Sequence, residues 1–160
     1  RSCTCTAGIV CGNGTSTANA RGMAPDIQLH YTNYSSVTSG MSRWQVIQEL
    51  VNQYDVMFTT ASWGDARTRD YTSISADADD IIFDHDIAWT QSQSNAGDQM
   101  SRPQAWAKNI VGVGGVTHGN TLTRTDDYSS GSTGPAADGR IKPDIVAPGS
   151  PTGAGVRSIP

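Results

Sequence analysis

The sequence predicts an α/β fold with a mostly parallel sheet, and two observations support this prediction. Short apolar runs alternate along the chain with amphipathic stretches of helical spacing, which is the pattern of repeated β-α units. Hydrophobic residues make up only 36% and charged residues only 16% of the 160 residues. The chain instead contains 17 glycines and many small polar residues. This composition favours a loop-rich α/β protein over a helical bundle. The length suits one domain over 1–160, with an irregular tail over 148–160.

The individual elements follow from apolar periodicity and from the residues that start or stop helices. A short helix over 6–11 stops at the Gly12-Asn13-Gly14 turn. Ser42 is a suitable N-cap for a helix that ends near Tyr54. The apolar face of that helix comprises Trp44, Ile47, Leu50 and Val51. The other predicted elements are strands over 27–31, 56–60, 87–91, 110–113 and 145–147 and a helix over 75–83.

The charge of the chain bears on its partners. The net charge is −4, and lysine occurs only at Lys108 and Lys142, so no stretch of sequence gathers basic residues. Such a chain is not expected to bind nucleic acid or an anionic membrane surface. No apolar run approaches the roughly 18 residues that a membrane-spanning helix needs.

Three cysteines, Cys3, Cys5 and Cys11, lie close together, and an odd number cannot pair fully within one chain. We expect small, half-buried thiols on a helix. The alternatives are a Cys5–Cys11 or Cys3–Cys11 bridge, or a bridge between two chains. Their spacing lacks the paired C-x2-C ligands of structural zinc, so no zinc is expected there.

Five aspartates lie close together between residues 77 and 86, which raises the question of a calcium site. They are Asp77, Asp79, Asp80, Asp84 and Asp86. Their spacing lacks the D-x-D-x-D-G loop with its terminal Glu, so we interpret them as a solvated helix face. The tryptophans are interpreted as core or cleft walls. No metal and no cofactor are therefore expected.

The stretch over 128–149, YSSGSTGPAADGRIKPDIVAPG, is the most informative of the chain. It resembles the segment FSSxGPxxDGRxKPDxxAPG that precedes the nucleophile in subtilisin-like serine peptidases. Four further blocks resemble the same family in the same order, namely TCTAGIVCGNG at 4–14, RGMAPDIQL at 21–29, SWG at 62–64 and SNAGD at 94–98. The resemblance implies a three-layer α/β domain of subtilisin type, a hydrolase lineage of the serine peptidase or esterase type, and a secreted protein.

The resemblance also implies roles for particular residues. Ser62, Trp63 and Gly64 would pair with the substrate backbone, and Asn95 would donate its side-chain amide to the oxyanion. A peptide or a small ester is the implied partner.

The N-terminal block departs from the family pattern. Aligning its Ala-Gly pair with the family's Val-Ala-Gly places Ser2 where the catalytic His is expected, Cys3 at the following Gly and Cys5 at the second His. The strand with the catalytic Asp would precede Arg1, and the helix with the nucleophilic Ser would follow Pro160. We therefore expect no member of the triad in this chain and an incomplete sheet.

Three hypotheses about function follow. The first is a hydrolase relative with weak or lost peptidase activity and a residual esterase activity that uses Asn95. The second is a non-catalytic peptide-binding or scaffold module that uses 62–64. The third is a rebuilt site in which Ser2, Cys3 or Cys5 acts with His30 as base.

The missing strand has a consequence for the sheet. In the family it lies between the strands that match 27–31 and 56–60, so its loss leaves two unpaired edges across a gap. Either the remaining strands close up or another chain fills the place. We predict a non-standard sheet or a homo-oligomer formed by strand exchange.

Overall fold

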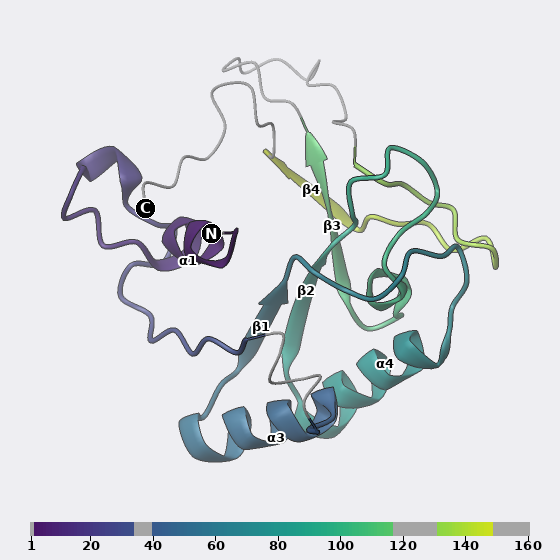
Figure 1. The fold of residues 1–160 in the computed structure, drawn as a ribbon, viewed down its shortest axis with the longest axis horizontal. Helices are drawn as coiled ribbons and strands as arrows, with labels where there is room; N and C mark the ends of the chain where they lie inside the picture. Colours follow the sequence, from purple (N-terminus) through teal and green to yellow (C-terminus); the bar gives the residue numbers. More distant parts are fainter. Residues whose placement is uncertain (1, 34–39, 117–130, 149–160) are drawn as a thin grey trace.

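A four-stranded parallel sheet forms the centre of the molecule in the computed structural model, which describes residues 2–33, 40–116 and 131–148 (Figure 1). Its strands are β1 (Phe58–Ala61), β2 (Ala88–Ser92), β3 (Val111–Val116) and β4 (Ile145–Pro148), in the spatial order β1-β2-β3-β4. All three pairings are parallel. The predicted α/β class with a parallel sheet is confirmed.

The helices are α1 (Ser2–Cys11), α3 (Arg43–Tyr54) and α4 (Ser73–His85), with short 3-10 turns η1 (Ala18–Ala20) and η2 (Pro103–Trp106). Figure 1 shows α3 and α4 together on one side of the sheet, while α1 lies apart from both of them. Among the described residues, α3 and α4 with the sheet give two of the three expected layers.

Helix α3 begins where the sequence predicts, because Ser42 closes a capping box. The Ser42 hydroxyl accepts from the backbone N–H of Gln45 at 3.2 Å, and the Gln45 side chain accepts from the backbone N–H of Ser42 at 2.8 Å. The helix ends at Asp55, whose φ of 53° is left-handed.

The main core lies between these two helices and the sheet. It comprises Ile47, Ala78, Ile81, Ile87, Trp89, Ala107 and Ile110. The predicted apolar face of α3 packs there, with Ile47 buried and Trp44, Leu50 and Val51 partly buried against it. Burial of this face, more than helix propensity, holds α3 in place.

Two charged residues of the 128–149 stretch, Lys142 and Asp144, have a structural role. The buried Lys142 donates from Nζ to the Ile110 carbonyl at 2.8 Å and to the Asp144 carboxylate at 2.6 Å. That carboxylate also accepts from the backbone N–H of Gly112 at 2.6 Å. These bonds fasten the start of β4 to the start of β3.

The predicted strand over 27–31 is wrong. Residues 28–33 have no regular secondary structure, and Ile27, Leu29 and Tyr31 are 46%, 42% and 60% exposed. A strand needs a neighbour for its backbone groups, and no strand pairs with this segment in the part of the chain that the structure describes. The sheet formed by the described strands is therefore continuous, and β1 and β4 are its two outer strands. From residue 149 the predicted irregular tail lies outside the described residues.

Candidate functional site

Two of the predicted site segments lie at the same end of the sheet, where the carboxyl ends of β1 and β2 meet. Ser62-Trp63-Gly64 follows the last residue of β1, and the loop over 94–98 follows β2. The two strands are adjacent and parallel, with Ala61 opposite Gln91. The carboxyl ends of neighbouring parallel strands form the usual position for a binding site in an α/β sheet. The structure thus brings the expected substrate segment and the expected oxyanion loop to one edge.

Strand pairing ends at Ala61, and beyond it side chains contact the 62–64 segment. The Gln91 side-chain N–H donates to the Trp63 carbonyl at 2.9 Å. Gly64 lies so close to η2 that a Cβ there would be 2.5 Å from Gln104 Oε1 and 2.9 Å from Arg102 Cβ. Only glycine permits this close approach.

The loop with Asn95 is also a built structure. Ser94 has a left-handed φ of 83°, and its hydroxyl accepts from Arg67 Nε at 3.0 Å. The backbone N–H of Ala96 donates to Ser132 Oγ at 3.1 Å, and the Ser132 N–H donates to the Ser94 carbonyl at 2.9 Å. Asn95 itself is exposed. A fixed loop therefore presents the Asn95 side chain to solvent.

Ser132 is a site residue that the sequence did not single out. It is fully buried, and its hydroxyl also donates to the Met100 carbonyl at 2.7 Å. It lies within the 128–149 motif, so its position in that block is the signal that could have identified it. Its role is to tie the Asn95 loop to the segment that leads to β4.

The structure does not bring His30 to this edge. The His30 ring packs on Tyr54, with ring centroids 4.2 Å apart. Tyr54 ends α3, four positions before β1 begins at Phe58, so the pair belongs to the amino end of that strand. Asn95 lies beyond the carboxyl end of β2.

Ser2, Cys3 and Cys5 lie on α1, and their side chains are outside the described ones. Cys11, at the end of the same helix, is a free and half-buried thiol that donates to the Ala7 carbonyl at 3.2 Å. The expected thiol on a helix is thus confirmed for Cys11.

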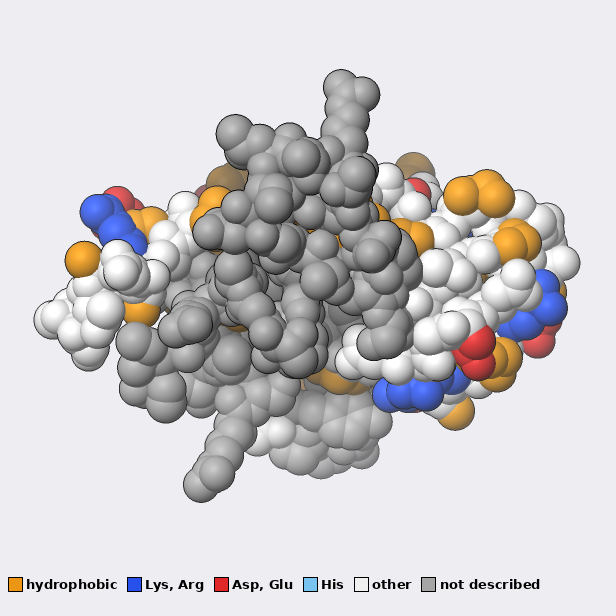
Figure 2. Space-filling model, turned by 90° about the horizontal axis from the view of Figure 1, so that it is seen from above, with side chains coloured by type: hydrophobic (Ala, Val, Ile, Leu, Met, Phe, Trp, Pro, Cys, Tyr) orange, Lys and Arg blue, Asp and Glu red, His pale blue; other side chains and the backbone are white. Residues whose placement is uncertain are grey.

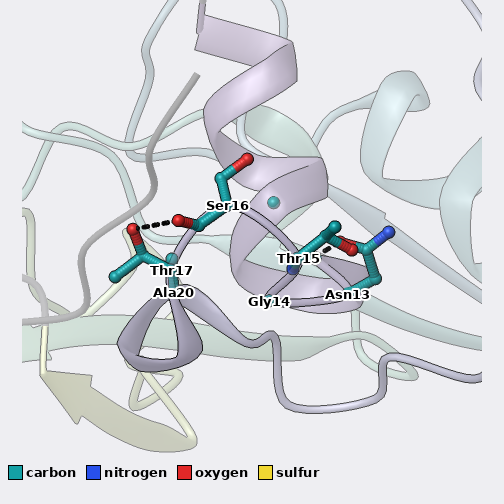
Figure 3. A pocket seen from close by; sticks show the side chains of 8 residues that line it. Asn13, Gly14, Thr15, Ser16, Thr17 and Ala20 are labelled. Carbon is teal, nitrogen blue, oxygen red and sulfur yellow. Dashed lines mark hydrogen bonds between the residues drawn. The ribbon is translucent and has the colours of Figure 1, made fainter.

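A pocket beside the carboxyl end of α1 is lined by Asn13, Thr15, Ser16 and Thr17 together with small residues (Figure 3). Thr17 Oγ1 donates to the Ser16 carbonyl at 2.7 Å, and Asn13 Oδ1 accepts from the Thr15 N–H at 3.0 Å. These groups close local turns, and the labelled side chains do not converge on one point in Figure 3. We therefore do not assign the site to this pocket.

The interpretation of the five aspartates as a solvated face is wrong for Asp79. This residue is 8% exposed, and its carboxylate accepts from Tyr71 Oη at 2.9 Å and from the N–H groups of Lys108 at 3.0 Å and Asn109 at 2.6 Å. Asp79 thereby holds η2 and the approach to β3 against α4. Another of the five, Asp84, accepts from Trp44 Nε1 at 2.8 Å.

Tyr71 has an altered acidity because of this contact. Partial burial, followed by the hydrogen bond to Asp79, raises the pKa of the Tyr71 hydroxyl above its usual value. The cations of Lys108 and Arg140 lie 5.1 and 5.0 Å from the ring centroid. Tyr71 is thus a packed structural residue at neutral pH.

Charges of both signs lie close together among the described residues of one face. Figure 2 shows that, on the face seen from above, the described basic side chains lie beside acidic ones.

Within the described ranges, no three His, Cys, Asp or Glu residues are grouped so that they could hold a metal ion. No helix in those ranges is long and apolar enough to cross a membrane.

Comparison with known proteins agrees with the fold and with the motifs. The chain resembles the solved structure of the prenylagaramide maturation protease PagA, with a TM-score of 0.53 and 16% sequence identity. The match covers 86% of this chain and 50% of that one, so the chain spans half the length of that structure. A family model described as the subtilase family matches residues 3–159. The chain therefore belongs to the subtilase family, a lineage of peptidase-like hydrolases.

Proposed function

We propose that the carboxyl end of β1, with Ser62, Trp63 and Gly64, binds an extended peptide by adding it as a strand. The observation that carries this proposal is that β1 pairs with β2 on one side, and that no described strand pairs with it on the other. An extended peptide can satisfy such an edge with its own backbone groups. Membership of a peptidase family supports a peptide as the ligand.

A second function, weak hydrolysis of activated esters, is supported by the fixed loop that exposes Asn95. A single oxyanion donor of this kind is worth about 3–4 kcal/mol of transition-state stabilisation. Such a donor together with substrate binding leaves about 10³–10⁴-fold acceleration over water, even where no triad acts. This suffices for a nitrophenyl ester and is far from sufficient for a peptide bond. Peptidase activity of this chain is accordingly weak or lost.

Peptide binding is tested by nuclear magnetic resonance with an acetylated and amidated hexapeptide of alternating Thr and Val. Backbone amide signals of residues 61–64 should shift on titration, while those of α4 should not. A proline-substituted hexapeptide, which cannot donate along one edge, is the matched control ligand and should shift them much less. Unmoved signals at 61–64 with the Thr-Val peptide would refute strand addition.

Ester hydrolysis is tested with short-chain nitrophenyl esters beside casein. Asn95→Ala should lower the esterase rate by about 10²-fold or more, since the oxyanion donor is removed. Asn52→Ala, an exposed site on α3, is the matched control and should change nothing. Full activity in Asn95→Ala would exclude this mechanism. Loss of activity on replacing Cys3, Cys5 and Cys11 by Ser would indicate the thiol route instead.

A further inference from the structure

Asp65 directly follows the peptide-binding segment and joins it to two other elements. Its carboxylate accepts from Gln104 Nε2 at 2.6 Å and forms an ion pair with Arg43. Its backbone N–H donates to Gln104 Oε1 at 3.3 Å, and its carbonyl accepts from Arg102 Nη1 at 2.7 Å. Asp65 is therefore bound through both its side chain and its backbone to α3 and to the start of η2.

Arg43 extends this network to Trp63. Its guanidinium carbon lies 5.5 Å from the centroid of the Trp63 ring, within the range of a cation–π contact. The side chains of Arg43 and Asp65 are 22% and 32% exposed. Partial shielding from solvent makes their attraction stronger than that of a fully exposed pair. The Asp65 carboxylate thus holds Arg43 where it covers the indole.

The contacts of Asp65 with Arg43 and Gln104 act on residues 62–64, which follow the last paired residue of β1. The described ladder between β1 and β2 ends at Ala61, and beyond it Gln91 bonds to Trp63 while Asp65 is anchored next to Gly64. A binding edge gains affinity when its donors and acceptors are fixed before the ligand arrives, because less ordering entropy is lost on binding.

We propose that Asp65 is the positioning residue of this peptide-binding edge, acting through Arg43 and Gln104 on Trp63 and Gly64. The inference rests on the proposed peptide-binding function. Asp65 does not touch the peptide in this proposal. It sets the geometry of the residues that do.

The test compares Asp65→Asn and Asp65→Ala with Asp70→Asn. Asp70 lies in the same loop, is exposed, and forms local hydrogen bonds with Thr68. Amide hydrogen exchange of residues 62–64 without peptide is the first readout, with amides of α4 as the internal reference. Asp65→Ala should raise exchange at 62–64 by about tenfold and leave α4 unchanged, because the local anchor is lost and the core is not.

The second readout is the dissociation constant of the Thr-Val hexapeptide. Asp65→Ala should weaken binding by about tenfold, Asp65→Asn by less, and Asp70→Asn by less than about twofold. The single variants Arg43→Met and Asp65→Asn are compared with the double variant that combines them. The double variant should bind the hexapeptide no more weakly than whichever single variant binds it less tightly, because both residues act on one network.

Exchange and affinity both within about twofold of the parent in Asp65→Ala would overturn the proposal. If that variant does not fold, Asp65→Asn, which keeps the side-chain volume, decides by the same criterion. If the hexapeptide shifts no signal in the parent chain, peptide binding fails, and the exchange experiment alone still shows whether Asp65 positions the edge.

Discussion

The side-chain amide of Gln91 donates to the backbone carbonyl of Trp63 across 2.9 Å. Gln91 is 1% exposed, so this bond is shielded from water. It joins a residue inside β2 to the segment just beyond the end of β1. A buried glutamine on a strand thus extends the contact between the two strands past the last ladder pair.

Replacing Gln91 by Glu should destabilise the fold strongly at neutral pH. The side chain keeps its shape, but an ionised carboxylate would face the Trp63 carbonyl in a buried place, at a cost of about 3 kcal/mol. A protonated carboxyl can donate as the amide does, so the loss relative to the parent should shrink as pH falls toward about 4. Urea unfolding of both chains at several pH values measures this. Gln53→Glu on the exposed side of α3 is the control, and an equal loss there would contradict the argument.

Gly64→Ala should destabilise the chain by about 1–3 kcal/mol. The new Cβ would meet Gln104 Oε1 at 2.5 Å and Arg102 Cβ at 2.9 Å, so either the loop or η2 has to move. Ser62→Ala, at an exposed position two residues earlier, should be almost neutral. Denaturant midpoints of the three chains give the comparison. A neutral Gly64→Ala would mean that the loop shifts freely and that the close approach is not required.

The sequence predicted those elements whose signatures lie within a few neighbouring residues. Such signatures mark the capping box at Ser42 and the apolar face of α3. They also mark β1 and β2, the strands that end at Ala61 and Ser92. The observed ends of these two strands differ from the predicted ones by one or two residues, and α3 ends at Tyr54 as predicted. The segment over 27–31 has the same kind of strand signature, yet forms no strand. Strand formation depends on a partner, which a local pattern does not report.

The site was predicted only as far as the family motifs reach. Those motifs named the 62–64 segment and Asn95, and the parallel sheet brings both to one edge. The supporting residues Gln91, Asp65 and Ser132 act across 28 to 39 positions of sequence, and no spacing rule connects such partners. Asp79 was missed for the same reason, because its burial depends on Tyr71 and on η2.

Asp79→Ala should cost about 3 kcal/mol of unfolding free energy, since three donors lose a buried carboxylate. Asp77→Ala lies two residues earlier on the same helix, is exposed, and should stay within about 0.5 kcal/mol of the parent. Urea unfolding followed by circular dichroism measures both. Equal effects of the two substitutions would show that Asp79 behaves as a surface residue.

Tyr71→Phe should show a pH-dependent difference from the parent chain. The pKa of Tyr71 is raised in the folded chain, by burial first and then by the Asp79 hydrogen bond. Below the unfolded value of about 10, the hydroxyl is protonated in both states, and its contribution of about 1 kcal/mol is fully present. Above that value the unfolded chain releases the proton first, so the contribution decreases as pH rises through the folded pKa.

Paired urea unfolding of the parent and Tyr71→Phe from neutral pH to about pH 11 tests this. The stability difference should be constant up to about pH 9 and should then fall, because only the parent carries the titrating hydroxyl. Asn52→Ala, at an exposed position of α3 whose side chain carries no titrating group, is the control and should show no such fall. A difference that stays constant or grows above about pH 10 would mean that Tyr71 ionises no later in the folded chain than in the unfolded one.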